Sequence, residues 1–288
     1  MHSSFKSLYN DELLLCIRQA VSEDLGQHGD HTSQAIFPTK HRSKAKLVAK
    51  DNGILAGVLF CQMVLEQHAP SVHLNPIYSD GDSFVKGDIL LKLEGETQQI
   101  LSLERILLNT LQRMSGIATI THSVQQAIRD TSCTVLDTRK TTPNFRIAEK
   151  WAVLIGGGVN HRMGLYDAIM LKDNHIDFCG GLDSALKKTK AYVDKLPSPI
   201  PVIVETRSLD DLRTCLKHSW ISRVLIDNMP PEQLIHAVAL VNNTFPTEAS
   251  GNITPDNVVA YAETGVDYVS LGYVTHSAPV LDMSLRAI

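Results

Sequence analysis

Residues 202–228 read VIVETRSLDDLRTCLKHSWISRVLIDN and contain one complete strand–helix–strand unit. An apolar run at residues 202–204 precedes a stretch with helical character at 209–218, and a second apolar run follows at 224–226. Two strands that are joined through a helix are typical of a parallel sheet. This stretch therefore predicts an α/β fold.

The same alternation recurs through the second half of the chain. Further apolar runs lie at residues 134–136, 168–171 and 268–271, and further helical stretches at 149–154, 182–193, 231–241 and 254–264. About six such units favour a barrel of parallel strands over an open sheet, although periodicity alone does not decide whether the sheet closes.

The first hundred residues follow a different pattern. Residues 11–23 have helical spacing, and short strand-like runs follow them at 44–49, 54–59, 72–78 and 89–94. Turn signals separate the later runs, which predicts an α+β module with antiparallel pairing. A long helical pattern then covers residues 103–129, and we expect it to weaken or break near Ser115-Gly116.

Composition narrows the class of protein. The 288 residues suffice for one large or two moderate domains, and 43% hydrophobic content argues against disorder. The net charge of -4 argues against a nucleic-acid partner, and no apolar run is long enough to span a membrane. The N-terminus lacks the apolar core of a signal peptide, and the five cysteines are scattered. We therefore expect a cytoplasmic protein.

Charged and polar residues follow the apolar runs in unit after unit. They form the following groups: Asp137-Thr138-Arg139-Lys140, Lys172-Asp173-Asn174-His175, Glu205, Asp227-Asn228, Glu248-Ala249-Ser250-Gly251-Asn252 and Leu271-Gly272. Charged residues also follow strands simply because loops face solvent. Here, however, cations occupy the early units and acids the later ones. This order favours an active site at the C-terminal strand ends, as in parallel barrels.

The early units concentrate positive charge. Between Asp137 and Lys172, six Lys and Arg residues stand against three acids, although the whole chain has an excess of acids. Arginine suits planar carboxylates and phosphates, and lysine supplies a compact charge. Three glycines at 156–158 precede His161-Arg162. They are either a flexible turn or a loop that presents these two side chains.

The polar residues of the later units are suited to binding a metal ion and phosphate groups. Glu205 and Asp227 end two successive strands, so they are placed either to share a magnesium ion, largely through substrate and water, or to pair with the cations opposite. Small residues at Ser250-Gly251 offer backbone amides to a phosphate. Gly272 fits the same role, but it equally fits a plain turn after a strand.

Spaced motifs along nearly the whole chain resemble the quinolinate phosphoribosyltransferase family, also called carboxylating nicotinate-nucleotide pyrophosphorylases. They are Glu23-Asp24-Leu25-Gly26, Glu104-Arg105, Leu108-Asn109, Thr138-Arg139-Lys140-Thr141, Gly156-Gly157-Gly158, His161-Arg162, Gly164-Leu165, Leu171-Lys172-Asp173-Asn174-His175, Glu248-Ala249-Ser250-Gly251 and Thr275-His276. So many motifs in one order make chance similarity improbable.

The resemblance implies an N-terminal α/β sandwich domain followed by an open α/β barrel of parallel strands. The expected bounds are residues 1–115 and 116–277, with residues 278–288 packing on the first domain. It also implies a homodimer that uses Mg²⁺ to convert quinolinate and phosphoribosyl pyrophosphate into nicotinate mononucleotide, pyrophosphate and carbon dioxide.

Roles for single residues also come from the resemblance. The two quinolinate carboxylates would be held by Arg105, Arg139, His161, Arg162 and Lys172, and Thr138 would be a further substrate-binding residue. Lys140 would lie between the substrates, and Lys140, Lys172, Glu205 and Asp227 would be the catalytic residues. Ser250, Gly251, Gly272 and His276 would line the phosphate end. Arg105 would complete the neighbouring subunit's site, although as a bare sequence feature it looks like an arginine on a helix surface.

One departure and three alternatives remain. Thr206-Arg207 stands where relatives often carry a smaller or acidic residue, which leaves contacts near the ribose and metal open. The alternatives are a molybdenum-transport-associated paralogue, a nicotinate phosphoribosyltransferase and a non-catalytic sensor of a pyridine dicarboxylate or phosphoribosyl ligand. Lys172 argues against the paralogue, release of carbon dioxide would exclude the nicotinate enzyme, and turnover would exclude the sensor.

Overall fold

The computed structural model describes residues 2–288 and divides into two compact units, each described by itself. The first unit comprises the chain up to His122 together with Thr141–Gly157 and Val274–Ile288. The second unit comprises Ser123–Lys140 and Gly158–Tyr273. No helix among residues 2–288 has the length and apolar character that crossing a membrane requires.

The first unit combines one antiparallel sheet with helices. Its helices are α1 (His2–Leu8), α2 (Asn10–Leu25), α3 (His31–Ile36), α4 (Val58–His68), α5 (Thr97–Ala127, whose last turn enters the second unit), α6 (Arg146–Ile155) and α12 (Tyr273–His276). The sheet has the order β12-β1-β5-β3, from β1 (Arg42–Ala49), β3 (His73–Pro76), β5 (Ile89–Glu96) and β12 (Met283–Ala287). A two-stranded sheet joins β2 (Gly53–Ile54) to β4 (Ser83–Phe84).

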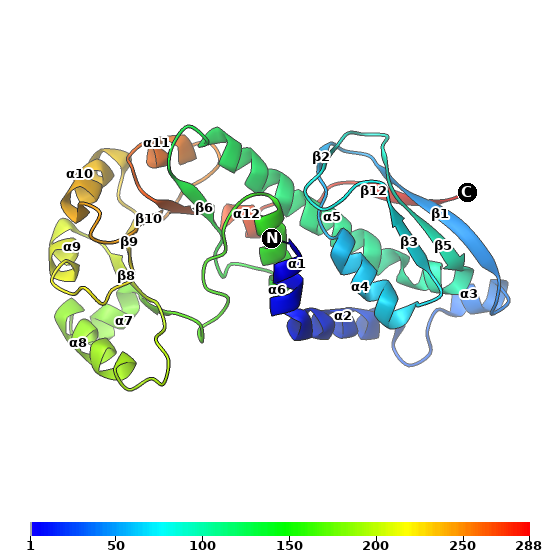
Figure 1. Cartoon of the computed structure of the whole chain (residues 1–288), viewed down its shortest axis with the longest axis horizontal. Coiled ribbons are helices and arrows are strands. Elements are labelled where there is room, and N and C mark those ends of the chain that lie inside the picture. The colour runs from blue at the N-terminus through cyan, green and yellow to red at the C-terminus, as the bar shows by residue number, and fades with distance from the viewer. Residues whose placement is uncertain (1) are drawn as a thin grey trace. The chain divides into compact units, whose positions relative to one another are not determined.

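Apolar residues of the sheet pack against α4 and α5. Leu47, Leu93 and Leu285 of the sheet line one small space with Cys61 of α4 and Leu107 of α5. Their burial follows from the alternation along β1 and β5, which directs every second side chain to the helices. Figure 1 shows the strands alongside α5. A sheet covered by helices in this way is an α/β sandwich.

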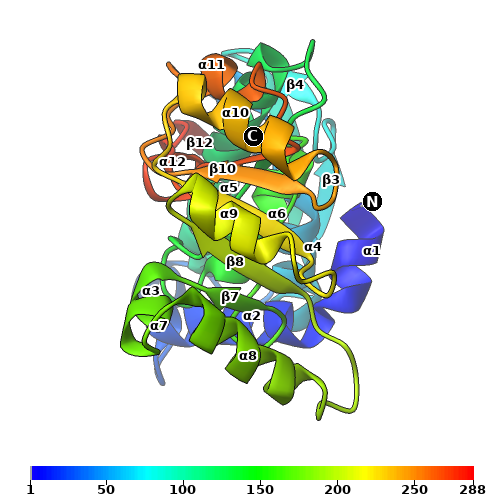
Figure 2. The ribbon, with the colours of Figure 1, turned by 90° about the vertical axis from the view of Figure 1, so that its left-hand side faces the viewer.

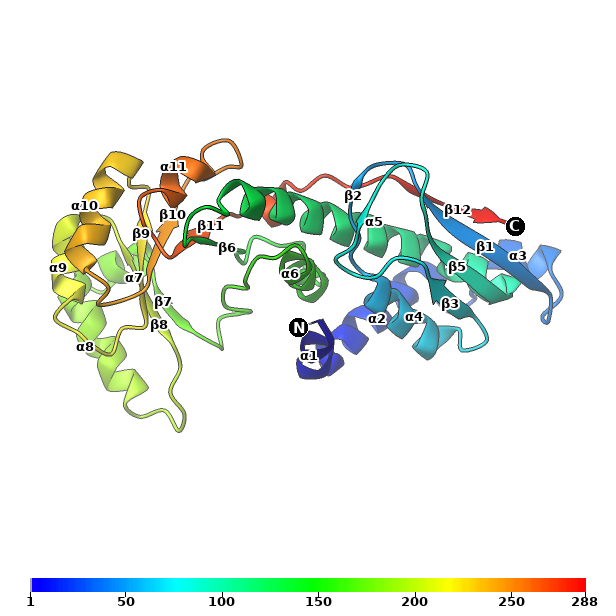
Figure 3. The same ribbon diagram turned by 45° about the horizontal axis from the view of Figure 1, so that its top comes forward.

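Helix α5 runs unbroken from Thr97 to Ala127, so the break expected near Ser115-Gly116 is wrong (Figure 3). The hydroxyl of Ser115 accepts a hydrogen bond from the backbone N–H of Ala56 at 3.0 Å. A Cβ at Gly116 would lie 1.8 Å from the carbonyl oxygen of Pro279. These two small residues therefore allow other segments to approach the helix closely, and they do not interrupt it.

The second unit is built on one six-stranded parallel sheet. Its order is β6-β11-β10-β9-β8-β7, from β6 (Thr134–Leu136), β7 (Ile169–Leu171), β8 (Val202–Thr206), β9 (Arg223–Asp227), β10 (Thr247–Ser250) and β11 (Tyr268–Ser270). The helices between the strands are α7 (Asp173–Phe178), α8 (Leu182–Val193), α9 (Leu209–Cys215), α10 (Pro231–Val241) and α11 (Val258–Ala262).

The parallel strands carry helices on one face. Figures 1 and 2 show α8, α9 and α10 along one side of β7 to β10. Strands β6 and β7 are the two edges and do not pair with each other within residues 2–288, so the sheet is open. The antiparallel first unit and the open parallel second unit confirm the predicted fold class. Because all six strands run in one direction, their C-terminal ends lie on one side, where most of the predicted site residues follow them.

Candidate active site

The loop after β6 carries the first cations. Asp137 is fully buried, whereas Arg139 and Lys140 are exposed. The hydroxyl of Thr138 accepts a hydrogen bond from the backbone N–H of Lys140 at 3.0 Å, which closes a tight turn. Asp137 therefore anchors the loop, and the two cations beyond it face outward.

Asp137 also anchors the loop that carries His161. Its Oδ1 accepts from the backbone N–H of His161 at 2.8 Å, and its Oδ2 accepts from Nδ2 of Asn160 at 2.6 Å. Buried carboxylates require such donors, because an uncompensated charge is costly in the interior. These bonds bring His161 and Arg162 to the end of β6, as the motif order predicts.

Arg162 is half-buried and lies within reach of the charge of Arg139. Partial burial lowers the pKa of Arg162, and the charge of Arg139 lowers it further. Nη1 of Arg162 donates to the carbonyl oxygen of Ala168 at 3.0 Å. Two guanidinium groups held near each other repel, so an anion between them would be bound strongly. This pair is the strongest indication of an anion site.

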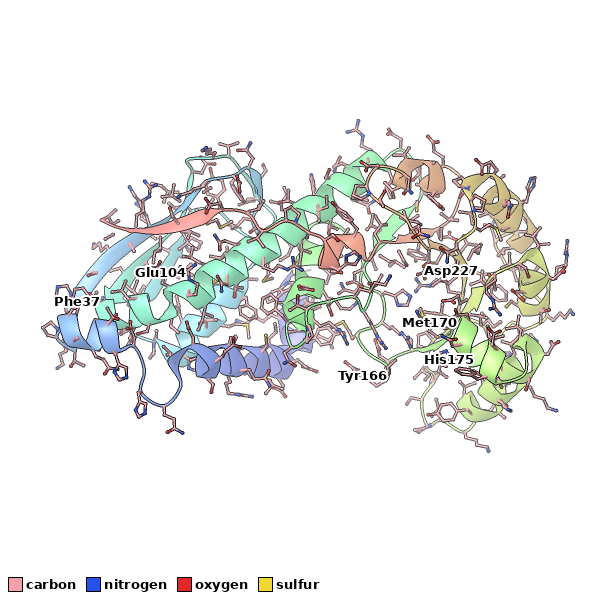
Figure 4. All side chains as sticks on the ribbon, turned by 180° about the vertical axis from the view of Figure 1, so that it is seen from behind. Phe37, Glu104, Tyr166, Met170, His175 and Asp227 are labelled. Carbon is pink, nitrogen blue, oxygen red and sulfur yellow. The ribbon has the colours of Figure 1, made fainter. Side chains whose placement is uncertain are left out.

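Lys172 extends the positive charge to β7. It is exposed and comes directly before α7, and its backbone N–H donates to Nδ1 of His175 at 3.0 Å. The side chains of Met170, His175, Asp227 and Tyr166 are marked in Figure 4 and come from β7, α7, β9 and the loop before β7. Lys172 thus lies between β7 and α7, at the same end of the sheet as the arginines.

Acidic residues face the cations from β8 and β9. Burial raises the pKa of Glu205, the nearby charge of Asp227 raises it further, and Lys172 acts in the opposite direction. The backbone N–H of Asp173 donates to Oε1 of Glu205 at 3.1 Å. The charges of Asp227 and Lys172 both act on Glu205, so these three residues lie near one another at the C-terminal ends of β7, β8 and β9.

Ser250 and Gly251, at the end of β10, pack against Asn228, which follows β9. The backbone N–H of Asn228 donates to the carbonyl oxygen of Ser250 at 2.8 Å. Gly251 has a φ of 94°, and a Cβ there would lie 2.2 Å from Oδ1 of Asn228. Only glycine fits this close approach. Gly272 is half-buried and follows Leu271, whose N–H donates to the carbonyl oxygen of Leu136 at 3.0 Å.

The second unit holds most of the predicted site. Its members are Thr138, Arg139, Lys140, His161, Arg162, Lys172, Glu205, Asp227, Ser250, Gly251 and Gly272. Arg105 and His276 belong to the first unit. Arg105 is exposed on α5 and lines a cavity of about 780 Å³ with Glu23, Asp24 and Asn109. His276 is exposed, with Nδ1 2.6 Å from Oγ of Ser277.

The carboxylates of Glu205 and Asp227 suit a magnesium ion that also binds substrate and water, but they do not suit a metal that is held by protein ligands alone. No three His, Cys, Asp or Glu side chains among residues 2–288 gather as metal ligands. Glu205 and Asp227 are two neighbouring carboxylates, which is the number that magnesium usually takes from a protein when phosphates and water complete its shell.

Comparison with known proteins decides the family. The model of the N-terminal domain of quinolinate phosphoribosyl transferase matches residues 30–115, and that of the C-terminal domain matches residues 117–286. The chain belongs to the quinolinate phosphoribosyltransferase family.

Relatives agree with this assignment along their length. A tobacco protein (Nicotiana tabacum) named quinolinate phosphoribosyltransferase [decarboxylating] 2b, mitochondrial, is 41% identical, over 94% of this chain and 80% of its own length. A Bacillus subtilis protein named probable nicotinate-nucleotide pyrophosphorylase [carboxylating] is 39% identical, over 99% and 93%. The solved nicotinate-nucleotide pyrophosphorylase of Francisella tularensis has a TM-score of 0.88 and 34% identity, and the match covers 97% of each chain.

The sequence motifs include Asn228 and Glu248 but did not predict the contacts that these two residues make. Asn228 packs on Gly251, and its Oδ1 accepts from Nδ2 of Asn252 at 3.1 Å. Glu248 is fully buried in the middle of β10 and contacts His161 and Arg223. No sequence signal marked Glu248 as buried, because β10 reads Thr-Glu-Ala-Ser and has the composition of a polar segment.

Proposed function

We propose that the chain transfers the phosphoribosyl group of phosphoribosyl pyrophosphate to the ring nitrogen of quinolinate, with decarboxylation. The products are nicotinate mononucleotide, pyrophosphate and carbon dioxide, which is a step of NAD biosynthesis. The family membership over both domains supports this reaction. The structural observation that supports it most is that Arg139, Arg162 and Lys172 lie in the same unit as Glu205 and Asp227, with the charge of Lys172 acting on Glu205.

The paired arginines suit the dicarboxylate substrate. Quinolinate carries two adjacent carboxylates, so its binding requires several cations within a short span. Arg139 and Arg162 would supply them at the end of β6 and Lys172 at the end of β7, and Thr138 would add a hydroxyl. The resemblance also assigns His161 to this group. Planar guanidinium groups match the carboxylates in two-point contacts.

The acidic pair suits the transfer step. As the bond from C1′ of ribose to pyrophosphate breaks, positive charge develops on C1′, and the ring nitrogen then forms its new bond there. Ionised Glu205 and Asp227 would stabilise that charge, and Lys140 would lie between the substrates. Magnesium, held by Glu205 and Asp227 through substrate and water, would neutralise charge on the leaving pyrophosphate. Ser250, Gly251, Gly272 and His276 would line the phosphate end.

Decarboxylation follows from the ribosylated ring. Once the ring nitrogen carries the ribosyl group it is cationic. The bond from C2 to its carboxylate can then break, with the electron pair left on C2 beside that charge. Carbon dioxide leaves and C2 takes up a proton, so no organic cofactor is needed.

Arg105 fits a site shared between two copies of the chain. It is exposed on α5 and lines an open cavity of about 780 Å³ together with Thr142 and Phe145. We propose that the protein is a homodimer in which Arg105 reaches the dicarboxylate site of the neighbouring subunit. Mixing an inactive Arg105→Ala variant with an inactive Lys172→Ala variant would then restore part of the activity, because mixed dimers contain one intact site.

We also propose a cytoplasmic location, on the basis of the scattered cysteines. The tobacco relative is named as mitochondrial, so tagged full-length protein should be located in its own cells.

The reaction is tested by incubating the purified protein with quinolinate, phosphoribosyl pyrophosphate and MgCl₂. Nicotinate mononucleotide and carbon dioxide should appear in equal amounts, and only when all three components are present. Product from nicotinate in place of quinolinate, without carbon dioxide, would instead identify a nicotinate phosphoribosyltransferase. Ligand binding without product would indicate a sensor.

A further inference from the structure

Glu248 is a buried carboxylate that the reaction as described above does not use. It lies in the middle of β10, is 0% exposed, and faces groups from three other segments. Nη1 of Arg223, in β9, lies 3.0 Å from its Oε2, and the hydroxyl of Ser270, in β11, donates to its Oε1. Burial raises the pKa of Glu248, but the contacts with His161, Arg223 and Ser270 outweigh this effect and leave the pKa lowered.

The third partner is His161. Its side chain is 5% exposed, and its Nε2 lies 3.4 Å from Oε2 of Glu248. This separation exceeds that of a good N–H···O hydrogen bond, so the contact is chiefly electrostatic. An ionised carboxylate only accepts, and it therefore favours the form of the ring that carries a proton on Nε2.

The other ring nitrogen of His161 faces the backbone. The N–H of Arg162 donates to Nδ1 of His161 at 2.6 Å. A nitrogen that accepts a hydrogen bond carries no proton, so this bond also selects the Nε2–H tautomer. Glu248 and the Arg162 backbone thus fix the same ring from opposite sides.

We propose that Glu248 is a positioning residue, which holds His161 in the Nε2–H tautomer so that His161 sets the backbone of Arg162 beside Arg139. Arg223 supports Glu248 and is itself held over the ring of Tyr268, 4.7 Å from the centroid. In this arrangement both ring nitrogens of His161 are directed at protein groups, so His161 acts on quinolinate through the position of Arg162 and not by the direct contact that the resemblance implies. The inference rests on the proposed function only where it concerns quinolinate affinity.

The tautomer is measured directly by ¹⁵N spectroscopy of protein labelled at its histidines. The His161 signals are identified by their loss in His161→Asn. At pH 7.5 the wild-type protein should show a protonated Nε2 and an unprotonated Nδ1. Protons on both nitrogens, or on Nδ1 alone, would overturn the proposal. This measurement needs neither substrate nor activity, so it stands even if the proposed reaction fails.

Kinetics test the consequence for the site. Glu248→Gln should raise the KM for quinolinate by about tenfold or more and leave the KM for phosphoribosyl pyrophosphate within about threefold. Glu263→Gln, at the exposed end of α11, is the matched control. Equal changes in both KM values, or none in either, would contradict a positioning role.

Two replacements of His161 test whether this residue positions Arg162 or acts through its own charge. The Oδ1 of Asn can replace Nδ1 as acceptor for the Arg162 N–H, whereas Phe cannot. His161→Asn should therefore keep a quinolinate KM at least about fivefold lower than His161→Phe. The same KM in both variants would contradict the proposal. His236→Asn, on the exposed face of α10, is the control for loss of a histidine.

Discussion

The backbone N–H of Asp173 donates a hydrogen bond to Oε1 of Glu205 at 3.1 Å. The bond joins the first residue of α7 to β8, so the cation Lys172 and the carboxylate Glu205 are placed by the same contact. Asp227 on the next strand adds negative charge close to Glu205. Cations and carboxylates therefore lie at neighbouring strand ends. The cations and the carboxylates can each be replaced and tested separately.

Glu205→Gln should separate stability from activity. Burial, and then Asp227, raise the pKa of Glu205 above its ordinary value of 4.5. The native state therefore holds a proton on Glu205 more tightly than the unfolded state, and ionising Glu205 costs stability as the pH rises above 4.5. The variant should have a higher Tm than wild type at pH 7.5, and the difference should narrow as the pH falls towards 4.5, while kcat falls by at least about 100-fold. A lower Tm at pH 7.5 would refute the sign of this argument.

Lys172→Ala should abolish turnover and leave the fold intact. Lys172 is exposed, so its removal creates no cavity, but it removes a cation from the proposed carboxylate site. We expect kcat/KM to fall by at least about 1,000-fold with an unchanged thermal unfolding curve. Lys188→Ala on α8 is the matched control, and normal activity of Lys172→Ala would exclude the assignment.

Arg162→Lys should be nearly as harmful as Arg162→Ala. Lysine keeps the charge but loses the planar two-point geometry and the bond to the Ala168 carbonyl. The KM for quinolinate should rise by about 10-fold or more in both variants. Arg213→Lys, on the exposed face of α9, should change nothing. If lysine restored full affinity, charge alone would be sufficient.

Glu149→Ala should destabilise the first unit. Glu149 is 0% exposed, and its Oε1 accepts from Nε and Nη2 of Arg113 at 3.0 and 2.8 Å. Its Oε2 accepts from the backbone N–H of Thr142 at 3.1 Å. Removing one partner of a buried pair costs about 3–5 kcal/mol, which denaturant unfolding would detect. Glu263→Ala is the control, and an unchanged midpoint would show that the Arg113 contact contributes nothing.

Arg207→Ala should have little effect on catalysis. The guanidinium of Arg207 donates to both carboxylate oxygens of Asp177, on α7, at 3.0 and 2.7 Å. Thr206 is buried, and its hydroxyl donates to the carbonyl oxygen of Leu225 at 3.2 Å. The departure at Thr206-Arg207 thus has structural partners, and kcat should stay within about threefold of wild type, as for an exposed ion pair. A loss of 100-fold would mean that Arg207 acts in the site.

The sequence predicted the parallel unit well because its signal is local. Five of the six strands contain a short apolar run that is followed by polar residues, so Glu205 and Asp227 could be placed at one sheet edge without coordinates. The exception is β10, which reads Thr-Glu-Ala-Ser and was interpreted as a polar segment after a strand. Gly116 was misinterpreted, since a glycine in a helix looks like a break until the Pro279 carbonyl is seen against it.

Other features depend on contacts between distant segments. The pairing of Glu248 with His161 joins residues 87 positions apart, and that of Arg113 with Glu149 joins residues 36 apart. Composition and periodicity hold no information about such pairs. The roles of Arg105 and His276 came from the family resemblance alone, and they stay predictions.

The central claim is that the second unit binds a ring dicarboxylate and releases the carboxylate next to the ring nitrogen. Quinolinate labelled with ¹³C in either its 2- or its 3-carboxylate tests this most directly, in the presence of phosphoribosyl pyrophosphate and MgCl₂. We predict that the 2-label leaves as carbon dioxide, one for each nucleotide formed, and that the 3-label stays in nicotinate mononucleotide. A nucleotide that retains both labels, or no nucleotide from folded protein, would contradict the account.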